Sequence, residues 1–222
     1  MAKTRIQECD SISKYIVCIE GIDGCGKDTQ LKLLADKGYY VTGEPDYSSP
    51  IGNLLHDILS KKIAPRSKST IEYLFAADRT EHIEAMKEHV KSNSDPKSKL
   101  CITGRYKYSG LVYTEVPKIT YYLNSDMPEA GLFIFLEIDP EKAISRIAKR
   151  DFGSRELYEN IEKLTTVNDE FSKIIRRFKT ENEAINGDKI FPEVVIINAE
   201  LSQEEIHNQI IHTIEDYIAS KL

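Results

Sequence analysis

The segment that most constrains the fold is residues 21–29, GIDGCGKDT, which directly follow the apolar run YIVCIE at residues 15–20. The segment fits the GxxxxGK pattern of a phosphate-binding loop, with Asp28 where the pattern has Ser or Thr. A strand, a glycine-rich loop and a helix N-terminus in this order surround a phosphate with backbone N–H groups. The alternative is a glycine-rich turn with an incidental lysine, but the strand before it and the helix after it favour phosphate binding.

We therefore expect Lys27 to contact the β and γ phosphates of a nucleoside triphosphate. The rest of the loop is predicted to form the ATP site around it, through Gly21, Asp23, Gly24, Cys25, Gly26, Asp28 and Thr29.

Five short runs rich in β-branched or aromatic residues predict strands, at residues 15–20, 39–42, 100–103, 132–138 and 194–198. The runs are apolar at nearly every position, as in strands buried on both faces of a parallel sheet. Helical signals lie between them and after them, at residues 28–37, 50–62, 70–92, 108–123, 140–151, 156–183 and 202–222. This alternation predicts a doubly wound α/β fold with a five-stranded parallel sheet flanked by helices, in one domain over residues 1–222.

Composition excludes several classes of function. The 30 Lys and Arg residues against 36 Asp and Glu residues give a net charge of −6, so we expect no general binding to nucleic acid or to an anionic membrane. No apolar run reaches about 18 residues and the N-terminus is polar, so we expect a cytoplasmic protein. Four cysteines form no CxxC pair, so we expect no metal cluster. Five histidines show no ligand spacing, so we assign them no chemistry.

Three segments carry a family resemblance. The first is IEGIDGCGKDTQ at residues 19–30, the second is YLFAADR at residues 73–79, and the third is GRY at residues 104–106, continued by Ser109, Gly110 and Tyr113. Together they resemble the thymidylate kinases, a family of P-loop nucleoside monophosphate kinases, over nearly the whole chain. The resemblance implies transfer of a phosphoryl group from ATP to a deoxynucleoside monophosphate, most of all dTMP, with Mg²⁺ as cofactor and a homodimeric protein.

The resemblance also implies roles for single residues. Phe75 would stack on the thymine, Arg79 would donate a hydrogen bond to its carbonyl, and Arg105 would bind the acceptor phosphate. Further contacts with the acceptor nucleotide would come from Asp23, Tyr106, Ser109 and Tyr113. Other readings stay open, because Phe75 lies in an amphipathic helix where it could belong to the core, and Arg79 could pair with Glu72 or Glu81.

The family places its catalytic arginine in the P-loop or in a mobile lid, and residues 23–25 of this loop contain none. The resemblance therefore points to a lid near residues 146–158, which offers Arg146, Arg150 and Arg155. We favour Arg150 and Arg155 as catalytic residues, in addition to Lys27 and Arg105. Phe152 and Gly153 between them indicate a break in the helix that would form the tip of the lid. A solvated helix end is the alternative for this run.

The chain departs from the family pattern at Asp28, at Gly104 in place of an Asp, and at Gly43 and Tyr47, where an arginine is expected at the end of the second strand. We hypothesise that Asp28 supplies to Mg²⁺ the charge that Gly104 cannot, and that Gly104 leaves room for it. Alternatively Asp28 only caps the helix. Two further functions stay open, another nucleotide or deoxynucleoside kinase and a nucleotide-binding protein that has lost catalysis.

Overall fold

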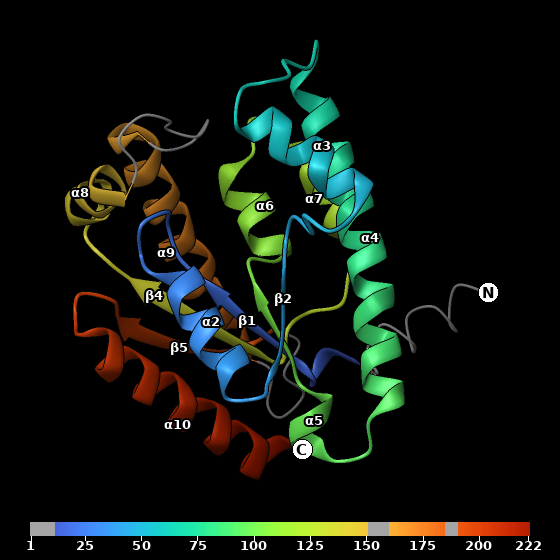
Figure 1. The fold of residues 1–222 in the computed structure, drawn as a ribbon, viewed down its shortest axis with the longest axis vertical. Coiled ribbons are helices and arrows are strands. Elements are labelled where there is room, and N and C mark those ends of the chain that lie inside the picture. The colour runs from blue at the N-terminus through green and yellow to red at the C-terminus, as the bar shows by residue number, and fades with distance from the viewer. Residues whose placement is uncertain (1–11, 151–159, 185–190) are drawn as a thin grey trace.

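The computed structural model describes residues 12–150, 160–184 and 191–222, and in it five parallel strands form one sheet (Figure 1). The order across the sheet is β2-β3-β1-β4-β5. The strands are β1 Ile16–Glu20, β2 Tyr40–Gly43, β3 Cys101–Gly104, β4 Leu132–Glu137 and β5 Glu193–Asn198. The five predicted strands and the doubly wound fold are thus confirmed, each strand to within one residue at either end.

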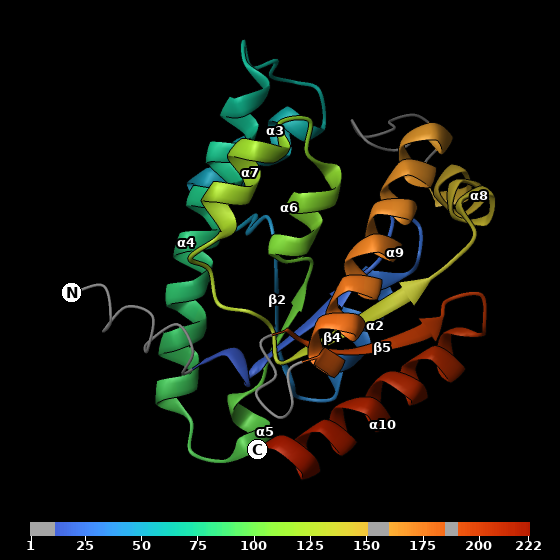
Figure 2. The same ribbon diagram turned by 180° about the vertical axis from the view of Figure 1, so that it is seen from behind.

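Helices cover both faces of the sheet. Helices α2 (Lys27–Asp36) and α10 (Gln203–Lys221) lie over one face, and α9 (Ile161–Ala184) lies over the other (Figures 1 and 2). The remaining helices are α3 Pro50–Leu59, α4 Lys68–Ser92, α5 Pro96–Lys99, α6 Lys107–Tyr113, α7 Pro117–Asn124 and α8 Pro140–Arg150. None of the helices in the described residues combines the length and apolar composition that crossing a membrane requires.

The single helix predicted over residues 108–123 is wrong, because the chain forms α6 and α7 there. Pro117 lies at the first turn of α7, and Val116 before it has φ −133° and ψ 63°, outside the helical region. Proline has no N–H to donate and its ring disfavours a helical conformation in the preceding residue, so a break is forced at this point.

Burial differs between the centre and the edges of the sheet. Every residue of β1 and β3 is buried, whereas β2 and β5 are only partly covered, and Ile196 in β5 is 39% exposed. The expectation that all five strands are buried on both faces is therefore wrong for β2 and β5, which lie at the edges of the sheet.

The register places the ends of three strands together. Ile19 of β1 lies beside Gly104 of β3, and Gly104 lies beside Gly43 of β2. A Cβ atom at Gly43 would lie 3.0 Å from the carbonyl oxygen of Gly104. This close approach brings the segments after β1, β2 and β3 to one edge, where open parallel sheets bind ligands.

Candidate active site

The loop between β1 and α2 has the backbone shape of a phosphate-binding loop. Gly24 has φ +83°, and a Cβ there would lie 2.5 Å from the carbonyl oxygen of Ala143 in α8, so only glycine fits. Gly26, with φ +96°, is the N-cap of α2. The ammonium of Lys27 donates to the Gly21 carbonyl over 2.8 Å and lies 3.5 Å from the sulfur of Cys25. The loop therefore gathers N–H groups and one ammonium at a helix N-terminus.

A pocket of about 600 Å³ opens beside this loop. The predicted residues that line it come from the loop, from α4 and from the segment after β3: Asp23, Gly24, Gly26, Lys27, Asp28, Thr29, Phe75, Arg79, Arg105, Tyr106, Ser109 and Tyr113. Gly21 and Cys25 do not line it and are buried. Three segments far apart in the sequence thus face one cavity.

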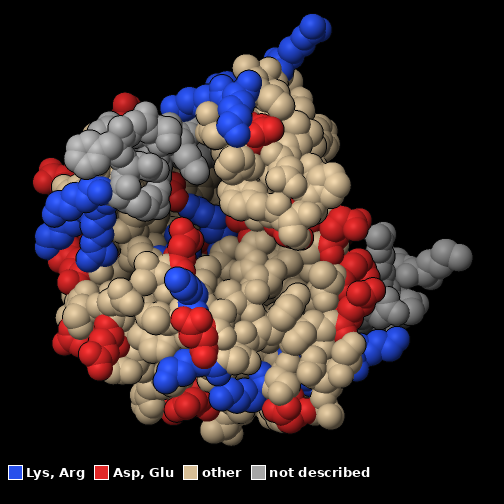
Figure 3. Space-filling model, viewed as in Figure 1, with Lys and Arg blue, Asp and Glu red and all other residues tan. Residues whose placement is uncertain are grey.

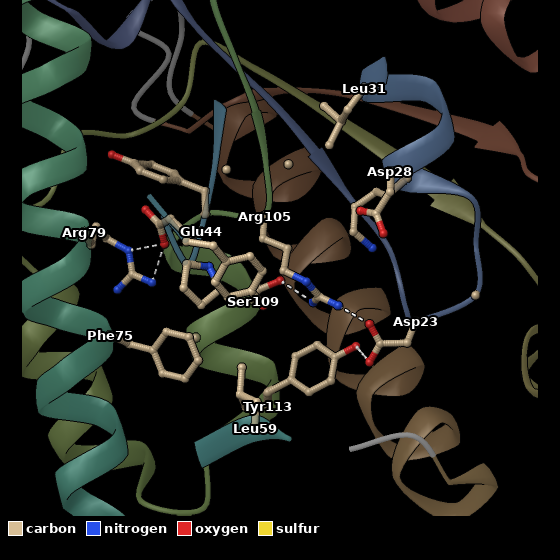
Figure 4. A pocket seen from close by; sticks show the side chains of 18 of the residues that line it. Asp23, Asp28, Leu31, Glu44, Leu59, Phe75, Arg79, Arg105, Ser109 and Tyr113 are labelled. Carbon is tan, nitrogen blue, oxygen red and sulfur yellow. Dashed lines mark hydrogen bonds and ion pairs between the residues drawn. The ribbon is translucent and has the colours of Figure 1, made fainter. Parts of the chain in front are cut away.

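Arg105 is held at the centre of the pocket (Figure 4). Its guanidinium pairs with the carboxylate of Asp23 and donates to the Ser109 hydroxyl over 3.2 Å, while its carbon lies 5.0 Å from the centre of the Tyr113 ring. The Tyr113 hydroxyl donates to the other oxygen of Asp23 over 3.2 Å. Burial alone would lower the pKa of Arg105, but the Asp23 carboxylate overrides this effect and raises the pKa well above its usual value. Arg105 is therefore a permanent cation whose guanidinium is oriented by Asp23 and Ser109.

Glu20, the last residue of β1, is fully buried behind Arg105. One carboxylate oxygen accepts from the backbone N–H groups of Tyr106 and Ser109, over 2.9 and 3.2 Å, and the other accepts from the Ser109 hydroxyl over 2.7 Å. Burial raises the pKa of Glu20, whereas the Ser109 hydroxyl and the charge of Arg105 oppose that rise. Glu20 fixes the start of α6 and, through Ser109, the side chain of Arg105.

Arg79 lies at the other end of the pocket. Its Nε and NH2 donate to one oxygen of Glu44 over 2.8 and 2.7 Å, and NH1 donates to the Asn124 side chain over 2.6 Å. The Arg79 and Glu44 side chains are each 3% exposed. Arg79 therefore pairs with Glu44, which follows β2, and the alternative pairing with Glu72 or Glu81 is wrong.

Phe75 lies one turn before Arg79 on α4 and points into the pocket (Figure 4). It is half-buried and is absent from the described residues that make up the main hydrophobic core. Leu59 at the end of α3 lines the same part of the cavity. A ring that faces a cavity is free to stack on a flat ligand, which the core reading of Phe75 would not allow.

The space beside Gly104 holds Leu31 rather than Asp28. A Cβ atom at Gly104 would lie 2.2 Å from a terminal methyl of Leu31. The expectation that Gly104 leaves room for Asp28 is wrong, because the side chain of Leu31 projects from α2 into that space. Asp28 is exposed at the second residue of α2. The N-cap of this helix is Gly26, so Asp28 is not its capping residue, but its carboxylate lies in the first turn, where a negative charge is favourable.

The lid arginines divide into two groups. Arg146 in α8 lines the pocket. The side chain of Arg150 and the whole of Arg155 lie outside the described residues, as do the other residues at 151–159. Their catalytic role stays a prediction.

Three important residues were missed by sequence reasoning. Glu20 carried a signal, since it is a lone charge at the end of an apolar strand. His82 lies three residues after Arg79 and so on the same face of α4, but a histidine on a helix is too common to stand out. Asn124 carried no signal, because it reaches Arg79 only through the fold.

Comparisons with known proteins agree with this geometry. A family model described as thymidylate kinase matches residues 19–210. A Methanococcus aeolicus protein named "Probable thymidylate kinase" is 35% identical over 214 residues, which cover 92% of this chain and 97% of that protein. A Pyrococcus horikoshii protein of the same name is 34% identical and covers 89% of this chain and 94% of its own.

Among solved structures, a thymidylate kinase from Candida albicans superposes with a TM-score of 0.69. The match covers 91% of each chain at 23% identity, so it bears on the fold. This chain thus has the fold of a P-loop kinase of nucleoside monophosphates.

Proposed function

The chain belongs to the thymidylate kinase family, and we propose that it transfers the γ-phosphoryl group of ATP to dTMP. The observation that carries this proposal is the single pocket that joins the phosphate-binding loop at Lys27 to Phe75 and Arg79, with Arg105 between them. A phosphate donor and a nucleotide acceptor bound at these two ends would meet at Arg105.

Phosphoryl transfer needs little covalent chemistry from the protein, so alignment and charge stabilisation supply the rate. Lys27 and the loop N–H groups would hold the donor phosphates. Arg105 would hold the acceptor phosphate, with Asp23 and Ser109 fixing its direction. Phe75 would stack on the base and Arg79 would donate to its carbonyl. Tyr113 and Tyr106 would complete the acceptor site.

Magnesium fits the residues present. Mg²⁺ favours one or two carboxylates together with phosphate oxygens and water. Asp28 is an exposed carboxylate directly after Lys27, Thr29 offers a hydroxyl, and both line the pocket. When bound with ATP, the ion would neutralise charge on the β and γ phosphates. We propose Asp28 as its protein ligand.

We further propose that residues 146–158 act as a lid that excludes water during transfer. Arg150 and Arg155 would then reach the transferring phosphoryl group. Arg146, which already lines the pocket, would contact the donor nucleotide from α8.

The test of the proposed function is a coupled assay of ADP release with ATP, Mg²⁺ and a panel of acceptors. The panel contains dTMP, dUMP, dCMP and thymidine. We expect dTMP to give the highest kcat/KM and thymidine to give no turnover. Turnover of thymidine would indicate a nucleoside kinase, and tight nucleotide binding without turnover of any acceptor would indicate a protein that has lost catalysis.

We also propose that the protein forms a homodimer, as the family resemblance implies. The surface over α3 carries few charged side chains (Figure 3), and Leu54 within that helix is 38% exposed. A surface of this kind suits contact with a second copy. Light scattering after size-exclusion chromatography is expected to give twice the chain mass of 25.3 kDa. A monomer at micromolar concentration would contradict the proposal.

A further inference from the structure

Behind Arg79 lies a buried chain of hydrogen bonds that none of the proposed steps uses. His82 is one turn further along α4 and 4% exposed. Its Nδ1 lies 3.1 Å from Oε1 of Glu44, and its Nε2 lies 2.9 Å from the Thr42 hydroxyl. An ionised carboxylate only accepts, so the proton at this contact is on Nδ1. The Thr42 hydroxyl can donate to Nε2 or accept from it, so the ring is satisfied at both nitrogens.

The two oxygens of Glu44 have separate partners. Oε1 faces His82, while Oε2 accepts from Nε and NH2 of Arg79. The carboxylate plane is therefore fixed from the side opposite to Arg79. Without the N–H of His82, Oε1 would be buried without a donor, and the carboxylate would rotate to find one.

The orientation of Arg79 decides what the pocket can recognise. Glu44 takes the Nε and NH2 donors, and Asn124 takes one donor of NH1, while Asn124 itself donates to the Thr120 carbonyl over 2.7 Å. One N–H on NH2 and one on NH1 remain. A Cβ atom at Gly110 would lie 3.5 Å from NH2 and 3.8 Å from NH1, so the glycine leaves the space in front of these donors open to the pocket.

We infer that His82 is a positioning residue for base selection: through Glu44 it holds Arg79 so that its two remaining N–H donors face the base. This inference rests on the proposed function. A pyrimidine with a carbonyl at position 4, such as thymine or uracil, would accept from these donors. Cytosine carries an amino group at that position and would leave the buried donors unpaired, which a polar site rejects strongly.

The test measures kcat and KM for dTMP, dUMP and dCMP in the wild type and in two variants of His82. His82→Phe fills the volume without a donor, and we expect it to lower kcat/KM for dTMP and dUMP at least about tenfold, mainly through KM, because a buried acceptor loses its donor. The value for dCMP should stay within about threefold, so the ratio of dTMP to dCMP falls. His82→Asn keeps an N–H near the Nδ1 position and should retain the ratio to within about threefold.

Met86→Ala is the matched control, because Met86 is fully buried one turn further along the same helix and contacts the core rather than Glu44. It should lower the melting temperature and leave the ratio unchanged. Equal losses for all three acceptors in His82→Phe, or an equal change of ratio in Met86→Ala, would overturn the inference.

If His82→Phe does not fold, Thr42→Val decides. It removes the hydroxyl at Nε2, and we expect the ratio to fall at least about threefold. An unchanged ratio would overturn the inference. Wild-type enzyme that fails to phosphorylate dTMP would instead refute the proposed function, and calorimetric affinities of the same variants for dTMP and dCMP would then decide the role of His82.

Discussion

The two ends of the pocket each contain an arginine paired with a carboxylate, but the surroundings of the pairs differ. At the phosphate end, the side chains of Arg105 and Asp23 are 24% and 20% exposed. At the base end, those of Arg79 and Glu44 are each 3% exposed. A pair that water reaches can exchange one partner for a phosphate, whereas breaking a pair removed from water leaves an uncompensated buried charge.

The difference suggests two uses of one kind of contact. The phosphate end keeps its cations available for charge that arrives with each substrate. The base end keeps its cation fixed, so that recognition depends on which donors are left over. The phosphate end should therefore govern kcat and the base end should govern KM and selectivity, and each of the following changes tests one side of this division.

The largest effect is expected from the lid. Arg150→Ala or Arg155→Ala should lower kcat by about 10³ or more with little change in ATP affinity, since an arginine that acts on transition-state charge can be worth about 10³ to 10⁵ in rate. Single-turnover kinetics and ATP titration separate the two effects. If the double variant keeps normal kcat while Arg146→Ala loses it, the catalytic arginine is Arg146 and neither Arg150 nor Arg155.

Lys27→Ala should lower kcat at least about a thousandfold, because the ammonium stabilises charge that develops on the donor phosphates. The fold should survive, since Lys27 contacts the loop backbone rather than the apolar core. Lys32→Ala, an exposed lysine on the same helix, is the control and should be neutral. Near-normal turnover in folded Lys27→Ala would show that this ammonium does not stabilise charge on the donor phosphates.

At the base end, Phe75→Ala should raise KM for dTMP with little change in kcat, as stacking on a base is worth roughly 1 to 3 kcal/mol. Leu74→Ala is a neighbouring substitution on the same helix whose side chain does not line the pocket. It should leave KM unchanged. A lower melting temperature with constant KM in Phe75→Ala would show that the ring packs against the protein and does not stack on the base.

The sequence predicts the phosphate end of the pocket better than the base end. The phosphate loop is contiguous, so its strand, glycines, lysine and helix can be recognised together from residues 15–37. The base end is assembled from contacts that span 35 residues between Arg79 and Glu44 and 45 between Arg79 and Asn124. Family resemblance identified Arg79 and Phe75, but no local pattern encodes which carboxylate or amide holds the guanidinium.

The space beside Gly104 shows the same limit. The sequence shows that position 104 is a glycine, but it does not predict which side chain lies beside it. Leu31 enters that space only because α2 packs against β3. The helix break before Pro117 was predictable in principle, because proline and the residue before it restrict the backbone locally. Local covalent rules can thus be read from the chain, whereas neighbours brought by packing cannot.

A smaller effect tests the metal proposal. Asp28→Ser should weaken Mg²⁺-dependent turnover, and Gly104→Asp should restore part of it only when Leu31→Ala makes room. In a double-mutant cycle of Asp28→Ser and Gly104→Asp, with Leu31→Ala present in every variant, we expect a coupling energy above about 1 kcal/mol. The measurement is kcat/KM for ATP against Mg²⁺ concentration. Strictly additive losses would show that the two positions do not share a metal ion.

The smallest effect concerns Glu72, a buried carboxylate on α4 that lines the pocket and hydrogen-bonds to Thr114 and Thr120. Burial raises its pKa above the ordinary value of 4.5, while the two hydroxyls oppose the rise. A raised folded-state pKa means that the folded protein binds more protons than the unfolded chain over the interval between the two values. The free energy of unfolding therefore falls as pH rises through that interval.

Glu72→Gln has no proton to lose, so its stability should not fall over this interval. Relative to the wild type, we expect it to gain on the order of 0.5 kcal/mol at pH 7, the scale of a net hydrogen bond, and nothing at pH 3.5. Urea denaturation at the two pH values measures the difference. Asp57→Asn is the control of opposite sign, because the Lys62 ammonium lowers the pKa of that exposed carboxylate and the variant should lose stability at pH 7. If Glu72→Gln also loses stability at pH 7, the ionised carboxylate of Glu72 stabilises the folded base end. The charged side chains at that end would then serve stability rather than recognition of the base.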